Sequence, residues 1–235
     1  MPAERTAAAN TQLLRQRLFE RLLKERPRAV LDVGCGAGAL LRCGRSAGLA
    51  MVGLETRAEP LAGPVASGLA CVLGDGQALP FPDGALPWVV VRHALHHMAD
   101  PQRALEEAVR VARVGVVLAE PWRPLGLPEQ DLARELDAWL RRQERLAGQA
   151  HGDDLPAGQL VAWLDALGDW RLSVEHLLER AVRPLAEVRA DLERGCAELP
   201  PDHPERHLLD QLLVRAAEDG VGVTGTVIVT ARRAG

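Results

Sequence analysis

Hydrophobic residues recur with a helical period at the start of the chain and in short apolar runs after it. Leucines stand at every fourth position among arginines and glutamates: Leu14, Leu18 and Leu22. This spacing predicts an amphipathic helix over residues 10–25, which Pro27 would end. Residues 29–33 are apolar around one aspartate and lead into a glycine-rich turn and a helical pattern over 39–45. The order strand, glycine turn, helix is therefore predicted here.

Four further apolar runs predict strands over residues 49–54, 69–73, 88–91 and 114–119. Prolines and glycines leave room for only a short or broken helix between the first two runs. A helix with Asp100 and Pro101 at its start and Val111 near its end precedes the last run. Strands this apolar, separated by helices, indicate a mostly parallel sheet covered on both faces. Ligands bind such sheets at the carboxyl ends of the strands, where the unusual polar residues of this sequence cluster.

The second half of the chain is more helical. Its patterns predict helices over residues 128–146, 156–167, 184–198 and 204–219, and strands over 170–177 and 221–231. We expect a single α/β domain with a doubly wound, mostly parallel, seven-stranded sheet. Its sections would be a helical N-terminal cover (1–28), a cofactor-binding half (29–123), a helical insertion or lid after the fifth strand (124–168) and C-terminal strands and helices (169–235).

Charge and composition narrow the function classes. The chain has 28 basic and 32 acidic residues, a formal net charge of −4, and no visible basic patch, so we expect no nucleic-acid partner. No apolar stretch reaches the roughly 18 residues of a membrane helix, so we expect no membrane insertion, and the first residues lack the apolar core of a secretory signal. Four cysteines without metal-binding or redox spacing favour a reduced, cytoplasmic location.

The glycine-rich turn is the first candidate site. A strand that ends in glycines and opens a helix offers unpaired backbone N–H groups and lets a ligand approach the main chain. As a dinucleotide fingerprint, the turn would use Gly34, Gly36 and Ala39, with Glu55 where a ribose-binding carboxylate is expected. Asp32 favours a different ligand, because a buried carboxylate would repel a pyrophosphate but stabilise a bound ammonium or sulfonium group.

The turn and two later segments share a pattern. Residues 30–38 read Val-Leu-Asp-Val-Gly-Cys-Gly-Ala-Gly, residues 74–84 read Gly-Asp-Gly-Gln-Ala-Leu-Pro-Phe-Pro-Asp-Gly, and residues 96–101 read His-His-Met-Ala-Asp-Pro. In this order and spacing they resemble the class I S-adenosylmethionine-dependent methyltransferases. Within that family they are similar to the group that includes ubiquinone and menaquinone C-methyltransferases and many small-molecule methyltransferases. The resemblance covers residues 30–122 and becomes diffuse beyond them.

This resemblance implies a cofactor, a product and a set of binding residues. The cofactor would be S-adenosylmethionine, the product S-adenosylhomocysteine, and the methyl acceptor a small molecule. The residues expected to bind the cofactor are Asp32 near the methionine amine, Gly34, Cys35 and Gly36 along the methionine part, Glu55 at the ribose, Asp75 and Gly76 at the adenine, and Arg92 and His93 beside the reacting methyl.

Methyl transfer from a sulfonium is an in-line displacement, so positioning and exclusion of water can supply most of the catalysis. A general base is needed only when the acceptor arrives protonated, as a phenol or an enolisable carbon does. The candidates are His93, His96 and His97, which follow the strand nearest the expected methyl. Adjacent residues on a helical turn diverge, so His96 and His97 are not both expected to face the site. We expect no metal site, because the histidines lack carboxylates at ligand spacing.

Two segments depart from the family's pattern. Pro87-Trp88 stands in place of Phe-Asp, and Arg113-Val114-Gly115 replaces the usual Arg-Pro-Gly-Gly turn. We interpret both as structural changes. Aromatic residues that could pack on the cofactor are scarce in a chain without tyrosine, and the remaining candidates are Trp88, Trp122 and Phe19.

Two other function classes stay open at this point. The first is an NAD(P)-dependent oxidoreductase, which the glycine turn and Glu55 permit but which gives no reason for Asp32. The second is a non-catalytic, cofactor-binding partner subunit, which the departures from the family's pattern permit. The acceptor and the oligomeric state do not follow from the sequence.

Overall fold

The computed structural model describes residues 3–146, 148, 152–197, 199–200 and 202–234. The chain forms two compact units. The sheet unit combines Arg15–Pro121, Asp154–His176 and Val227–Gly235, and the helical unit combines Met1–Leu14, Trp122–Asp153 and Leu177–Thr226. The sequence predicts one domain, whereas the contacts separate into these two units, and residues 124–168 contribute to both.

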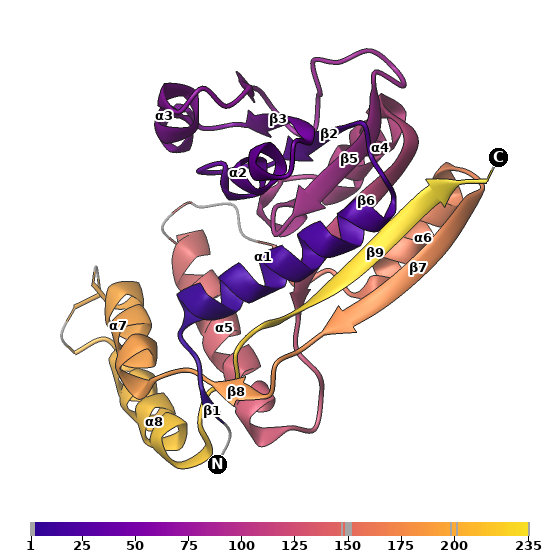
Figure 1. Ribbon diagram of the computed structural model, residues 1–235. Coiled ribbons are helices and arrows are strands. Elements are labelled where there is room, and N and C mark those ends of the chain that lie inside the picture. Colours follow the sequence, from indigo (N-terminus) through magenta and orange to yellow (C-terminus); the bar gives the residue numbers. More distant parts are fainter. Residues whose placement is uncertain (1–2, 147, 149–151, 198, 201, 235) are drawn as a thin grey trace. The chain divides into compact units, whose positions relative to one another are not determined.

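A seven-stranded sheet in the order β4-β3-β2-β5-β6-β9-β7 is the core of the sheet unit (Figure 1). The first five of these strands in the chain are β2 (Ala29–Val33), β3 (Ala50–Glu55), β4 (Cys71–Leu73), β5 (Leu86–Arg92) and β6 (Ala112–Trp122). These five strands pair in parallel with one another, and Asp32 of β2 lies opposite Gly53 and Val90. Parallel pairing brings the carboxyl ends of these strands to one edge of the sheet, as the sequence predicts.

The remaining strands are β7 (Trp170–Leu177) and β9 (Gly225–Arg233), with β9 between β6 and β7. Figure 1 shows β9 and β7 pointing in opposite directions. β9 also runs against β6, because Gly115 lies against Ala231 whereas Arg233, further along β9, reaches Ala112 at the start of β6. The sheet is therefore mostly parallel, with β9 antiparallel to both of its neighbours.

Helices cover both faces of this sheet. In Figure 1, α1 (Ala7–Lys24) passes in front of the sheet, and α6 (Ala157–Leu167) lies behind β9 and β7. The others are α2 (Ala39–Ser46), α3 (Ala58–Ala66), α4 (Pro101–Val111), which contacts α6, and the 3-10 turn η1 (Leu95–His97). Leu18 and Leu22 of α1 are fully buried, as their spacing predicts. Asp100 caps α4 by accepting a 2.9 Å hydrogen bond from the Arg103 N–H, which confirms the predicted helix start.

The helical unit contains α5 (Pro128–Leu146), α7 (Leu185–Gly195) and α8 (Pro204–Asp219), close to their predicted positions. Their apolar faces share one core, built around Leu132, Leu136, Trp139, Leu192 and Leu212. The sequence did not predict β1 (Ala3–Glu4) and β8 (Ala181–Val182), a two-residue parallel pair too short to have a period. No helix in the described part of the chain is long and apolar enough to cross a membrane.

The two departures from the family's pattern meet in space. Trp88 is 2% exposed, and a Cβ atom on Gly115 would lie 2.7 Å from its indole ring. The β5–β6 register shifts between Leu86 and Trp88, which accommodates the ring. Both segments are therefore structural, as interpreted from the sequence. The suggestion that Trp88 packs on a cofactor is wrong, because its ring fills the sheet core over Gly115.

Candidate functional site

Charged side chains mark the carboxyl ends of four neighbouring strands. Asp32 is the fourth residue of β2, Glu55 ends β3, Arg92 ends β5, and Glu120 lies near the end of β6. They act on one another electrostatically, since Asp32 is influenced by Arg92 and Glu55, and Arg92 by Glu120. The structure thus assembles at one edge the residues that the sequence assigned to successive strand ends.

The glycine turn between β2 and α2 has the backbone conformation that the sequence requires. Gly34, Gly36 and Gly38 have φ angles of 73°, 51° and 71°, in the left-handed region that favours glycine. A Cβ on Gly34 would lie 2.5 Å from that of Ala94, so this glycine is needed for packing. In contrast, apart from Gly36 and its two chain neighbours, the described residues place no heavy atom within 4 Å of the Cβ position of Gly36. That open face gives a ligand direct access to the main chain.

Glu55 holds this turn through its carboxylate. Its Oε2 accepts a 3.0 Å hydrogen bond from the N–H of Gly36, and its Oε1 accepts bonds of 3.1 and 3.2 Å from the N–H groups of Thr56 and Arg57. A carboxylate offers about four acceptor positions, so three are used and one remains for a ligand hydroxyl. Glu55 is 7% exposed. The side chain predicted to bind ribose therefore also shapes the turn.

Asp32 is buried in an unusual state. Its side chain is 2% exposed, and no hydrogen bond from the described residues reaches its carboxylate. Burial raises the pKa of Asp32 to about 7, Arg92 opposes this shift, and Glu55 adds to it. A buried carboxylate without donors is costly. A cationic hydrogen-bond donor bound at this position would remove that cost.

Arg92 and Arg15 add positive charge at the same edge. Arg92 is half-buried, and burial lowers the pKa of its guanidinium, Asp32 raises it, and the like charge of Arg15 lowers it. Arg15 comes from α1, in the part that belongs to the sheet unit. Sequence pattern does not single out Arg15, because an arginine on an amphipathic helix has no distinguishing pattern. Arg92 provides partial compensation for Asp32.

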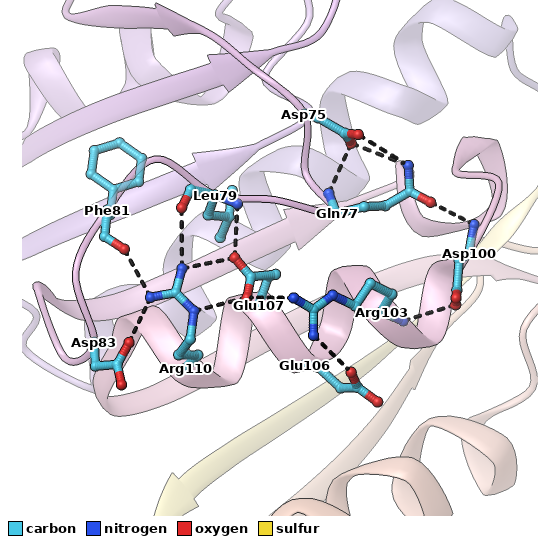
Figure 2. Close-up of polar contacts among 10 residues, drawn as sticks. All are labelled: Asp75, Gln77, Leu79, Phe81, Asp83, Asp100, Arg103, Glu106, Glu107 and Arg110. Carbon is cyan, nitrogen blue, oxygen red and sulfur yellow. Dashed lines mark hydrogen bonds and ion pairs between the residues drawn. The ribbon is translucent and has the colours of Figure 1, made fainter.

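The segment after β4 carries the residues predicted to meet adenine (Figure 2). Asp75 is exposed, and its Oδ1 accepts hydrogen bonds from the backbone N–H of Gln77 at 2.8 Å and from the Gln77 side chain at 3.1 Å. Gln77 in turn accepts a 2.7 Å hydrogen bond from the N–H of Asp100. Gly76 is buried, and a Cβ there would lie 2.8 Å from Met98. Gln77 therefore connects the second and third motifs of the sequence.

An ion pair between the buried Glu107 and the partly exposed Arg110 fixes the rest of that segment to α4, as Figure 2 shows. Arg110 bonds both carboxylate oxygens of Glu107, at 2.7 and 2.8 Å, and also the Leu79 and Phe81 carbonyls and Asp83. Glu107 is 5% exposed and accepts the N–H of Leu79 at 2.8 Å. The Arg110 hydrogen bonds lower the pKa of the Glu107 carboxyl. Residues 79–83 of the loop are thereby attached to α4.

The three histidines have different environments. His93 is half-buried and has a positive φ of 48°, which is unusual for a residue with a side chain and is often found at functional sites. His96 is 6% exposed, and its Nδ1 hydrogen-bonds Oε2 of the fully buried Glu120. His97 is exposed, with its ring centroid 4.1 Å from that of His96. As expected, the two adjacent histidines do not share one environment.

Glu120 connects the ends of β5 and β6. Besides His96, it accepts the N–H groups of Ala94 and Leu95 through Oε1, at 3.3 and 3.2 Å. This geometry lets Glu120 set the position and the tautomer of His96.

Cys35 belongs to the packing of the turn. It is 6% exposed in a cluster with Leu41 and Leu61, and burial raises the pKa of its thiol above the ordinary value. Because the thiolate is the nucleophilic form, this environment makes Cys35 a poor nucleophile. Its side chain points toward Gly53, whose missing Cβ leaves room for the sulfur.

This arrangement suits one kind of ligand. An ammonium or sulfonium group would stabilise ionised Asp32, hydroxyl groups would bond Glu55, and the open face of Gly36 admits the ligand to the main chain. The donors present therefore fit the S-adenosylmethionine that the motifs imply. A pyrophosphate in the same place would meet two carboxylates.

Known proteins share this pattern. Residues 31–119 match a family described as a methyltransferase domain. Ajmaline N-methyltransferase of Rauvolfia serpentina is 31% identical over 133 residues, which are 51% of this chain and 45% of that protein. Demethylmenaquinone methyltransferase of Thermus thermophilus is 35% identical over 123 residues, 48% of this chain and 56% of that protein. The matched region thus spans about half the length of these relatives.

Solved structures extend the similarity of fold. A SAM-dependent methyltransferase from Archaeoglobus fulgidus superposes with a TM-score of 0.57, covering 92% of this chain and 94% of that chain at 18% identity. At this identity the likeness concerns the fold alone. It includes the C-terminal half, where the sequence similarity is weaker.

Proposed function

Because the chain carries a class I S-adenosylmethionine-dependent methyltransferase domain, we propose that it transfers a methyl group from this cofactor to a small-molecule acceptor. One observation carries the proposal. Asp32 is a buried carboxylate that no described residue supplies with a hydrogen bond, beside a glycine turn with an open face. A ligand with a cationic amine is the missing partner of such a group.

We assign the binding roles as follows. Asp32 would bind the methionine amine, the turn Gly34–Cys35–Gly36 the methionine part, and Glu55 the ribose hydroxyls. Asp75 and Gly76 would contact adenine, and Arg92 and His93 would lie beside the methionine part and the methyl. When bound, the cofactor supplies an electrophilic methyl group on sulfur.

The chain's own catalytic contribution would be positioning and proton removal. Because the Glu120 carboxylate accepts hydrogen bonds, it places the hydrogen of His96 on Nδ1 and leaves Nε2 as the basic nitrogen. We therefore assign His96 as the general base for an acceptor that arrives protonated. We assign His93 and His97 to shaping the site.

A small acceptor is supported by the relatives' names, ajmaline N-methyltransferase and demethylmenaquinone methyltransferase. The net charge of −4 also gives no general attraction to a polyanionic substrate. Both points concern the class of acceptor, and the acceptor atom is a question for experiment.

The first experiment is calorimetric binding on the full chain. We expect S-adenosylmethionine and S-adenosylhomocysteine to bind and NAD(H) and NADP(H) not to bind. Glu55→Ala should weaken the binding of S-adenosylmethionine and of S-adenosylhomocysteine by about 1–3 kcal/mol, the range for a lost charge-assisted contact. If NAD(H) or NADP(H) binds and neither S-adenosylmethionine nor S-adenosylhomocysteine does, the proposal is wrong and the protein is better described as an oxidoreductase.

A second experiment tests the acceptor class. The protein is incubated with methyl-labelled S-adenosylmethionine and, separately, with the small-molecule filtrate and the macromolecular fraction of a cell extract. Label entering the filtrate supports a small acceptor. Label entering only macromolecules contradicts it, and cofactor binding with no transfer to either fraction favours a non-catalytic partner subunit.

A further inference from the structure

Four arginines surround one hollow of the sheet unit. The cavity measures about 520 Å³ and is lined by Arg113, Val114, Arg171, Arg232 and Arg233. This volume falls in the range of small-molecule sites, roughly 300–1,000 Å³. Four positive side chains around a single hollow are unexpected in a chain whose net charge is −4.

The hollow lies away from the candidate methyl-transfer site. Arg113 is the second residue of β6, Arg171 is the second residue of β7, and Arg232 and Arg233 end β9. Since β9 is antiparallel to its neighbours, its end meets the beginnings of β6 and β7. The arginines therefore occupy the amino edge of the sheet, opposite the carboxyl edge that holds Asp32 and its neighbours.

One of the four arginines is held rigidly. The guanidinium carbon of Arg233 lies 4.8 Å from the ring centroid of the buried Trp170. Its Nη2 donates to the carbonyls of Val109 at 3.0 Å and Ala112 at 3.3 Å, at the end of α4. Within the described residues Nη1 and Nε make no hydrogen bond, so two edges of a fixed guanidinium remain for a ligand.

The positive charge of the hollow is poorly balanced. Arg232 has one carboxylate partner, Glu25 at 3.5 Å, and that carboxylate also bonds Arg21 at 2.7 Å. Arg113 and Arg171 are exposed and make no ion pair with a described residue. The lining contains no acidic side chain. Like charges around one space repel each other, and a bound anion would relieve that repulsion.

We propose that this hollow, the arginine pocket, binds a small ligand through a diphosphate group. Guanidinium groups pair with phosphate oxygens in bidentate fashion, and a fixed arginine loses little entropy in doing so. Each phosphate carries a charge of about −1.5 to −2, so about two phosphates balance four arginines. The indole of Trp170 is covered by Arg233, which leaves the phosphates as the part that is recognised.

Calorimetry on the full chain without any methyl donor tests the pocket, using inorganic pyrophosphate as the probe at about 150 mM salt, where weak surface attraction is screened. We expect saturable binding of one pyrophosphate per wild-type chain. In the double variant Arg113→Ala/Arg171→Ala the affinity should be at least about tenfold lower, which corresponds to a loss of about 1.4 kcal/mol of binding free energy. The control Arg189→Ala removes one positive charge, half of the change in the double variant, from an exposed position on α7 and should bind pyrophosphate like the wild type. S-adenosylhomocysteine binding by the double variant reports its folding independently.

The alternatives give distinct results. An absence of saturable heat up to about 5 mM pyrophosphate, where even millimolar affinity is detected, would overturn the proposal. Equal weakening in Arg189→Ala would also overturn it, because the effect would then be one of net charge. Tighter binding of a short DNA duplex, lost in the same double variant, would assign the surface to nucleic acid instead. A comparison with ADP then separates two sources of the diphosphate group. Tighter binding of ADP than of pyrophosphate assigns a nucleoside diphosphate as the ligand, and weaker binding of ADP assigns free pyrophosphate.

Discussion

The pH dependence of cofactor binding gives the sharpest test of the role of Asp32. In the free protein burial raises the pKa of this carboxyl to about 7, from an ordinary value of 3.8. An ammonium ligand requires the ionised form. Below pH 7 the carboxyl group of Asp32 is mostly protonated and must lose its proton before the amine can bind, so ligand binding and proton release are coupled.

The magnitude follows from the fraction of ionised Asp32. At one pH unit below the pKa about a tenth of the molecules are ionised, and the apparent affinity falls in proportion to that fraction. Because half of the molecules are ionised at pH 7, S-adenosylhomocysteine affinity should fall about fivefold between pH 7 and pH 6, or about 1 kcal/mol. The ligand's own α-amino group titrates above this interval and stays protonated across it.

The assay is titration calorimetry with S-adenosylhomocysteine at several pH values, each in two buffers of different ionisation enthalpy. We expect nearly one proton to be released per ligand at pH 6 and fewer as the pH rises through 7. The control is Asp32→Asn, which removes the titrating carboxyl, so its binding should be weaker but flat with pH. An equal slope in wild type and Asp32→Asn, or no slope in wild type, would refute the reasoning.

Three other substitutions test the structure around the site. Gly34→Ala should lower the free energy of unfolding by about 2–4 kcal/mol, measured by urea denaturation, because it adds a left-handed alanine and a methyl clash; a change under 1 kcal/mol, about the cost of an unstrained site, would contradict the packing described. Arg110→Ala should lower the free energy of unfolding by about 1–3 kcal/mol in the same assay, because the buried Glu107 carboxylate loses its partly exposed partner. The pKa of Glu107 is lowered in the folded state, so the difference in unfolding free energy between wild type and Arg110→Ala should be largest above pH 4.5, the ordinary pKa of a glutamate. The difference should shrink as the pH falls below that value. A difference that stays constant with pH would contradict the ion pair. Glu120→Gln should lower kcat on an identified acceptor by at least about tenfold with unchanged S-adenosylhomocysteine affinity, since the amide no longer fixes the His96 tautomer; a rise in KM at constant kcat would show a merely structural role.

Much of the fold follows from periodicity and turn chemistry. The five parallel strands, α1, α4 and α5 lie within a few residues of their predicted bounds, because apolar runs, glycine turns and an Asp-Pro cap are local signals. The last strand is the poorest match: predicted over 221–231, it spans Gly225–Arg233. Its valine-rich start is continuous with the preceding loop, so composition alone does not mark where pairing begins.

The site shows a similar division. The predicted cofactor residues come to one edge of the sheet, because topology dictates it once the strands are parallel. The structure adds the contacts of Gln77 and Glu120, whose partners lie 23 and 24–26 residues away in the chain. The arginine pocket was invisible for the same reason, since its residues come from three strands and form no basic run. Its presence corrects the impression from the sequence that the chain has no basic patch.

The position of β9 has a consequence for how the chain reaches its native state. This strand is the last of the seven to be synthesised, yet it lies in the interior of the sheet, between β6 and β7. During translation β6 therefore presents an open edge of apolar residues until β9 emerges and inserts. The parallel half, which includes the glycine turn, can form early, whereas closing the sheet awaits the final strand. A nascent chain stalled before β9 would expose β6 to aggregation or to capture by a chaperone.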